Sequence, residues 1–127
     1  MTQVGKFWVG EAANGLPVMV IVGDVSGWRA AGRLLPELPA IHYADVFEVD
    51  SHMLRTLAPD IVLSPLVTAK FDALELAVRL HGLGFKGRYR AVTSPLPRPD
   101  LVLREVRARA PGLDFNFLLP TELGLDD

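Results

Sequence analysis

The sequence predicts a single α/β domain built on a five-stranded parallel sheet. Short apolar runs alternate with amphipathic segments along the 127 residues, which is the pattern of repeated strand–helix units. The first run, PVMVIV at residues 17–22, is continuous and rich in β-branched side chains, as is typical of a strand covered on both faces. The chain is long enough for one domain and too short for two.

Four further strands are expected, each separated from the next by a segment with helical periodicity. They lie within residues 41–47, 60–64, 88–93 and 114–119. Only seven residues follow Pro120, and they are too few and too polar for another core helix. We therefore expect an N-terminal arm or hairpin in residues 1–16, the domain in residues 17–120, and a polar C-terminal tail in residues 121–127, with no final helix.

Four helices are expected between the strands, and capping residues mark where they begin. Ser26 can cap the first helix by accepting from its free backbone N–H groups, and Asp50 or Ser51 opens the second. The last helix starts at Pro99, because proline fits a first helical turn.

Apolar stripes at spacings of three and four predict which helix faces are buried. In the third helix the expected stripe is Leu74, Ala77, Val78 and His81. In the last helix it is Val102, Leu103, Val106 and Ala110.

Composition excludes several kinds of site. Without cysteine there can be no disulfide, thiolate metal site or cysteine nucleophile. His42, His52 and His81 share no metal-ligand spacing, so neither a metal nor a cofactor is expected. Residues 1–17 lack the pattern of a secretory signal, and the longest apolar stretch is far too short to span a membrane. We expect a cytoplasmic protein without a membrane partner.

Basic residues gather late in the chain. Seven lie within residues 86–109, although the formal net charge of the whole chain is −2. Two interpretations stay open: a solvated helix face, or a docking surface for an acidic partner. The arginines that would form such a surface are Arg98, Arg104, Arg107 and Arg109. No nucleic-acid partner is expected, because no recognition helix accompanies these residues.

Several stretches together resemble the response-regulator receiver domain family. They are VIVGDVS at residues 20–26, DIVLSP at 60–65, FDALEL at 71–76, Thr93 after the fourth strand, and LLP at 118–120. The resemblance covers most of the chain. It implies a flavodoxin-like, three-layer sandwich with strand order 2-1-3-4-5.

The resemblance also shows departures at the family's phosphoryl-transfer positions. In the family, an aspartate after strand three is phosphorylated, two acids after strand one help to hold Mg²⁺, and a Thr or Ser and a Lys bind the phosphoryl group. Here Pro65 stands at the phosphoacceptor position, Gly23 replaces one acid, and Leu119 replaces the lysine. The vestigial pocket would consist of Gly23, Asp24, Ser64, Pro65, Thr93 and Leu119.

The resemblance therefore implies a degenerate pseudo-receiver that is not an enzyme. Asp24 is either a vestigial metal ligand or a turn or cap residue, and Thr93 is either a switch residue or a strand-end hydroxyl. Ser64 has no histidine placed by motif to activate it as a nucleophile. From the family's Lys-Pro pair we expect a cis peptide bond between Leu119 and Pro120.

Two functions fit this sequence. The first is a phosphorylation-independent signalling or scaffold module that binds a protein partner. The resemblance implies that this partner is a two-component signalling protein. The alternative is a small-molecule or nucleotide sensor that uses the vestigial pocket. If the fifth helix is absent, one sheet face needs cover, either from an arm carrying Phe7 and Trp8 or from a second subunit. We expect a homodimer.

Overall fold

The computed structural model describes residues 17–30, 32 and 40–120. The expected arm at 1–16 and tail at 121–127 lie outside the described residues. The elements are β1 (Met19–Val22), α1 (Val25–Ala30), β2 (Ile41–Ala44), the 3₁₀ turn η2 (Val46–Glu48), α2 (Ser51–Leu57), β3 (Ile61–Pro65), α3 (Ala73–Gly82), β4 (Arg88–Val92), α4 (Pro99–Arg109) and β5 (Asp114–Leu118).

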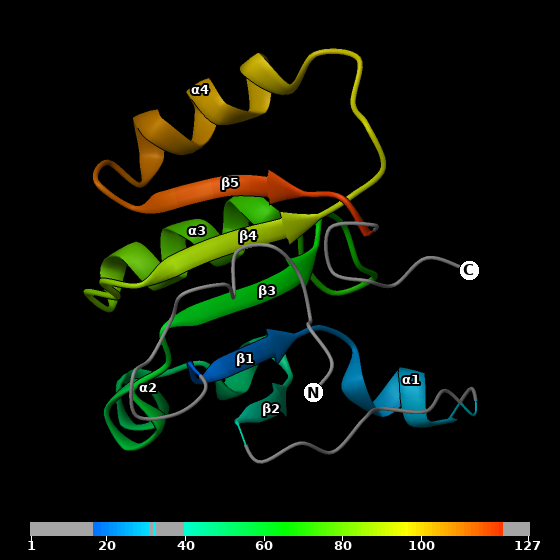
Figure 1. Ribbon diagram of the computed structural model, residues 1–127, viewed down its shortest axis with the longest axis vertical. Coiled ribbons are helices and arrows are strands. Elements are labelled where there is room, and N and C mark those ends of the chain that lie inside the picture. Colours follow the sequence, from blue (N-terminus) through cyan, green and yellow to red (C-terminus); the bar gives the residue numbers. More distant parts are fainter. Residues whose placement is uncertain (1–16, 31, 33–39, 121–127) are drawn as a thin grey trace.

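The five strands form one parallel sheet in the order β2-β1-β3-β4-β5, as predicted (Figure 1). The register keeps the carboxyl ends of neighbouring strands together: Val22 pairs with Ala44, and Val92 pairs with both Pro65 and Leu118. Side chains and loops that follow the strands therefore meet along one edge of the sheet.

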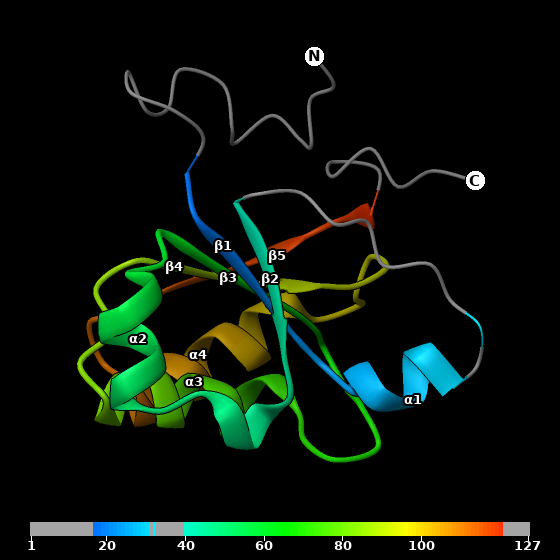
Figure 2. The same ribbon diagram turned by 90° about the horizontal axis from the view of Figure 1, so that it is seen from below.

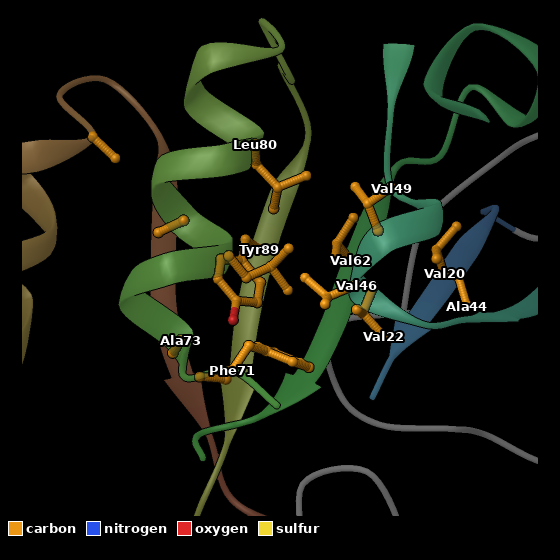
Figure 3. Packing of buried hydrophobic residues seen from close by; sticks show 14 of the residues in the cluster. Val20, Val22, Ala44, Val46, Val49, Val62, Phe71, Ala73, Leu80 and Tyr89 are labelled. Carbon is orange, nitrogen blue, oxygen red and sulfur yellow. The ribbon is translucent and has the colours of Figure 1, made fainter. Parts of the chain in front are cut away.

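Helices α2, α3 and α4 lie on the same side of the sheet, whereas α1 lies beyond the carboxyl end of β1 (Figures 1 and 2). The main core fills the space between this helical layer and the sheet (Figure 3). Its largest fully buried member is Tyr89 of β4, which lies against side chains of α3 such as Leu76 and Leu80.

A second core cluster lies on the other face of the sheet, and it is formed by the strand residues that alternate with those of the main core. Because successive side chains of a strand point to opposite faces, Val20 and Val62 face the helical layer while Met19 and Ile61 face the other side. Met19, Ile61, Leu63 and Leu118 are all buried. No large apolar side chain of this cluster is exposed among the described residues.

Two details of the helices differ from the sequence prediction. Helix α1 begins at Val25, so Ser26 lies inside the helix and cannot be its N-cap. In α3 the buried positions are Ala73, Leu76, Ala77 and Leu80, so the predicted stripe is displaced by one residue and only Ala77 is shared.

The N-terminus of α3 explains this displacement. The Asp72 carboxylate accepts from the backbone N–H of Glu75, and the Glu75 carboxylate accepts from that of Asp72. This reciprocal cap fixes the start of the helix. It directs the small Ala73 to the sheet and leaves His81 exposed.

Two helix starts are confirmed, whereas the predicted stripe of the last helix is fully buried at only two of its four positions. Asp50 caps α2 by accepting from the backbone N–H of Met53, at 2.8 Å. Helix α4 begins at Pro99, and it buries Val106 and the adjoining Ala110.

β5 forms one edge of the sheet. On the side of β5 that faces away from β4, the N–H of Phe117 is bonded to a neighbouring side chain. The N–H of Thr93 donates to the carbonyl of Leu118, so the backbone groups of Leu118 face β4. Because these groups alternate in direction along a strand, those of Asn116 also face β4. The N–H of Phe117 faces the opposite way. It donates to its neighbour's side-chain oxygen, Asn116 Oδ1, at 2.8 Å.

Candidate functional site

The carboxyl edge of the sheet brings the predicted pocket residues into one row. Gly23 and Asp24 follow β1, Pro65 ends β3, Thr93 follows β4 and Leu119 follows β5. Backbone hydrogen bonds tie these ends together: Gly23 N–H to the Ala44 carbonyl at 3.0 Å, Leu66 N–H to the Val92 carbonyl at 3.1 Å, and the Thr93–Leu118 bond at 3.1 Å.

The Asp24 carboxylate is held by groups of the chain itself. Its Oδ1 accepts from the backbone N–H of Gly27 at 3.2 Å, which places the carboxylate at the N-terminus of α1. A β-carbon at Gly27 would overlap this carboxylate. Lys70, from the loop between β3 and α3, brings its Nζ to within 3.4 Å of the same oxygen.

Asp45 also lies at this edge of the sheet, beside the start of α1, although it was not among the residues predicted from the sequence. It follows β2, and its Oδ1 accepts from the backbone N–H of Val25 at 3.1 Å. Its own N–H donates to the Glu48 carboxylate at 2.8 Å. The start of α1 is therefore fixed by carboxylates from two loops, Asp24 and Asp45. The only sequence signal for Asp45 was an acidic residue directly after a strand.

Ser64 is buried with its hydroxyl fully engaged. Its Oγ donates to the Pro65 carbonyl at 2.9 Å and lies 2.6 Å from the hydroxyl of Tyr89. Ser64 is 1% exposed and Tyr89 is fully buried. Since the serine proton goes to the carbonyl, the tyrosine hydroxyl donates to Ser64. Burial raises the pKa of Tyr89 well above its usual value.

Thr93 and Leu119 complete the edge. The Thr93 hydroxyl donates to the carbonyl of Ser94 at 3.0 Å, the geometry of a strand-end hydroxyl bonded to backbone. The described residues contain no cis peptide bond, so the predicted cis bond between Leu119 and Pro120 is wrong. The bond follows the ordinary preference of X–Pro peptides for trans, which is about 0.5–1 kcal/mol.

The four arginines predicted as a partner-binding face do not share one face. Arg98 lies just before α4 and pairs with Asp100 at 3.0 Å. Arg104 and Arg107 are exposed and lie three residues apart on one side of the helix. Arg109 follows Arg107 by two residues, about 200° around the helix, so it extends to the opposite side. The structure brings only Arg104 and Arg107 together.

No family model matches this chain, and no curated protein sequence matches it. Solved structures do resemble it. A two-component response regulator of the LuxR family from Aurantimonas sp. SI85-9A1 aligns with a TM-score of 0.54 and 16% identity, over 84% of this chain and 76% of that one. The fold is that of a response-regulator receiver domain.

Two further structures align over the same share of this chain. The N-terminal domain of the uncharacterized protein WS1339 from Wolinella succinogenes has a TM-score of 0.50 and 18% identity, over 82% of its length. The signal receiver domain of NarL, a proposed response regulator from Mycobacterium tuberculosis, has a TM-score of 0.49 and 18% identity, over 90% of its length.

Two findings describe the metal-binding and nucleophilic groups of the described residues. Among the described residues no cluster of three histidine, cysteine or acidic side chains could hold a metal ion. The Ser64 hydroxyl is buried and bonded to a carbonyl and to Tyr89, so no base activates it. Within the same part of the chain, no helix has the length and apolar character needed to cross a bilayer.

Proposed function

We propose that this chain is a signalling or scaffold module that works without phosphorylation, by binding a protein partner. The observation that carries the proposal is the end of β3. At the last two positions of that strand the chain has the buried Ser64 and then Pro65, and neither side chain is a carboxylate. An acyl phosphate cannot form there.

The surroundings of Asp24 support the same proposal. A receiver that accepts a phosphoryl group needs a divalent cation beside its acids, because the cation neutralises the developing charge. Here the Lys70 ammonium lies 3.4 Å from the Asp24 carboxylate and supplies a positive charge from within the chain. Asp24 Oδ1 also accepts from the backbone at the N-terminus of α1, so this oxygen has two partners from the chain itself.

A protein partner fits the charge of this chain better than a nucleic acid does. The formal net charge is −2, which gives no general attraction to a phosphate backbone. The partner class includes a second copy of this chain.

A phosphodonor assay tests the proposal directly. The protein is incubated with Mg²⁺ and acetyl phosphate beside a working receiver domain as a positive control, and intact masses are recorded. We expect a phosphoryl adduct on the control and none on this chain. An adduct that is lost on treatment with hydroxylamine would reveal an acyl phosphate and overturn the proposal.

Thermal melting distinguishes the proposed protein-binding module from the alternative function, a small-molecule or nucleotide sensor. A ligand that binds only the folded state raises the melting temperature by mass action. We expect no rise with Mg²⁺ and beryllofluoride, and none with a panel of nucleotides. A rise with one nucleotide would instead identify a small-molecule sensor.

A further inference from the structure

Two of the exposed apolar side chains in the described part of the chain lie beside the same groove. The large exposed apolar residues there are Phe47, Val67 and Leu101, at 74%, 67% and 47% exposure. Val67 and Leu101 both line a groove of about 380 Å³ on the helical side of the sheet. Phe47 lies on η2 and is not among the lining residues.

Two segments form the walls of this groove. One is the loop from β3 into the first turn of α3, and the other is the N-terminal half of α4. The lining residues are Leu66, Val67, Asp72, Ala73, Leu74, Leu101, Val102 and Glu105. Most of these side chains are apolar. The groove therefore suits one or two apolar side chains of a partner.

Internal hydrogen bonds hold the loop wall in place. Thr68 Oγ1 accepts from the backbone N–H groups of Lys70 and Phe71, each at 3.1 Å. Val67 and Asp72 form an isolated antiparallel bridge across the loop. The Ala73 N–H donates to the Leu66 carbonyl at 2.8 Å. A preformed wall lowers the ordering cost of binding, so the exposed Val67 is displayed in a defined position.

The charged residues of the groove are acidic. Asp72 and Glu105 line opposite walls, and both are exposed. Glu75 lies within one turn of Asp72 and is also exposed. Arg98, a cation near the start of α4, is already paired with Asp100. An apolar floor between two carboxylates complements a ligand that carries an apolar anchor flanked by cations.

We propose that this groove binds a basic amphipathic segment of a partner protein. A leucine-like anchor would pack between Val67 and Leu101, and lysine or arginine side chains beside it would meet Asp72 and Glu105. The inference rests on the proposed function and names the partner chemistry. Because the groove is small, the complex is a transient one.

A synthetic peptide provides the probe. It has about 14 residues, long enough for a marginal helix, with leucine on one face and lysine on the other. A matched peptide carries glutamate in place of lysine. Amide chemical shifts of the ¹⁵N-labelled full chain locate the contact, and fluorescence anisotropy of the labelled peptide gives the affinity.

Three variants make the test specific. Leu101→Ser removes part of the apolar contact, Glu105→Gln removes one carboxylate, and Phe47→Ser removes an exposed apolar side chain outside the groove. The lysine peptide should bind the wild type, bind each of the first two variants about tenfold more weakly, and bind Phe47→Ser as it binds the wild type. Shifts should centre on the loop before α3 and on the start of α4. The glutamate peptide should not bind.

Failure of this proposal is distinguishable from failure of the proposed function. No binding, or binding that Leu101→Ser and Glu105→Gln leave unchanged, would overturn the groove assignment while leaving the phosphodonor result intact. If sedimentation shows a wild-type dimer that Leu101→Ser converts to a monomer, the occupant is a second copy, and the proposed basic partner is wrong.

Discussion

At the scale of single residues, the pairing of Ser64 with Tyr89 determines what the end of β3 can do. The two hydroxyls lie 2.6 Å apart although their residues are 25 positions apart in sequence. Nothing in the local pattern of either strand marks this contact. Tyr89 occupies an inward position of β4, where periodicity predicts a large apolar residue, and its hydroxyl needs a partner because it is buried.

Removing either hydroxyl should destabilise the fold, by unequal amounts. Tyr89→Phe loses one buried hydrogen bond, at a cost of about 1 kcal/mol. Ser64→Ala leaves the tyrosine hydroxyl buried without its acceptor, which costs about 1–3 kcal/mol. The double variant should be less destabilised than the sum, since neither partner is then left unpaired. Urea unfolding of all four proteins measures this coupling, and strict additivity would contradict it.

The same tyrosine should give the fold a pH dependence in alkali. Because the pKa of Tyr89 is raised on folding, the folded protein holds this proton more tightly than the unfolded chain. Its contribution is fully present below the unfolded pKa of about 10 and is lost as the pH rises above it, by up to ~1.4 kcal/mol per pH unit. The difference in unfolding free energy between wild type and Tyr89→Phe should be constant below about pH 10, and above it should shrink and then reverse in sign, because only the wild type loses stability there. Parallel curves would exclude this linkage.

At the scale of elements, the sequence predicted the order of the strands in the sheet and which segments form strands. All five strands and the start of α4 follow from apolar runs and from proline and glycine positions, because these signals are local. The phase of α3 was missed, since its apolar residues allow two adjacent stripes and the cap at Asp72 selects one. The contact of Lys70 with Asp24 joins two loops far apart in sequence, so only the parallel sheet order brings them together.

The junction between α3 and β4 depends on a glycine. A β-carbon at Gly87 would come within 2.5 Å of the backbone carbonyl oxygen of Asp60, which also accepts from the Arg88 N–H at 3.0 Å. That carbonyl cannot move without disturbing the pairing of β3 with β4. Gly87→Ala should therefore cost about 1–3 kcal/mol of unfolding free energy.

Gly82 provides the control for this substitution. It is the last residue of α3, and no atom lies within 4 Å of its added β-carbon. Gly82→Ala should be neutral or stabilise by up to about 1 kcal/mol. Equal thermal stabilities of Gly87→Ala and Gly82→Ala would show that the close approach to Asp60 has no consequence.

At the scale of the whole molecule, burial is unevenly shared among the elements. Helix α3 buries four residues, whereas α4 buries one, Val106. Strands β3 and β4 lie in the interior of the sheet and include fully buried side chains such as Val62 and Tyr89. Opening of α4 should therefore cost less free energy than opening of the sheet or of α3.

Hydrogen exchange measures this difference. We expect the amides of β3, β4 and α3 to exchange slowest, through global unfolding, and those of α4 to exchange faster through local opening. Equal protection of α3 and α4 would mean that the helical layer opens as one unit. In that case the walls of the proposed groove would move together rather than independently.

The bond between Asn116 and Phe117 has a consequence for the behaviour of this protein at high concentration. A free edge strand is a template on which another chain can add a strand, and such addition leads to fibrous aggregates. Asn116 occupies one of the N–H groups that an incoming strand would need, and β5 is five residues long. We therefore expect the asparagine to hinder the addition of a further strand at β5, while the helical side of the sheet stays accessible to a partner.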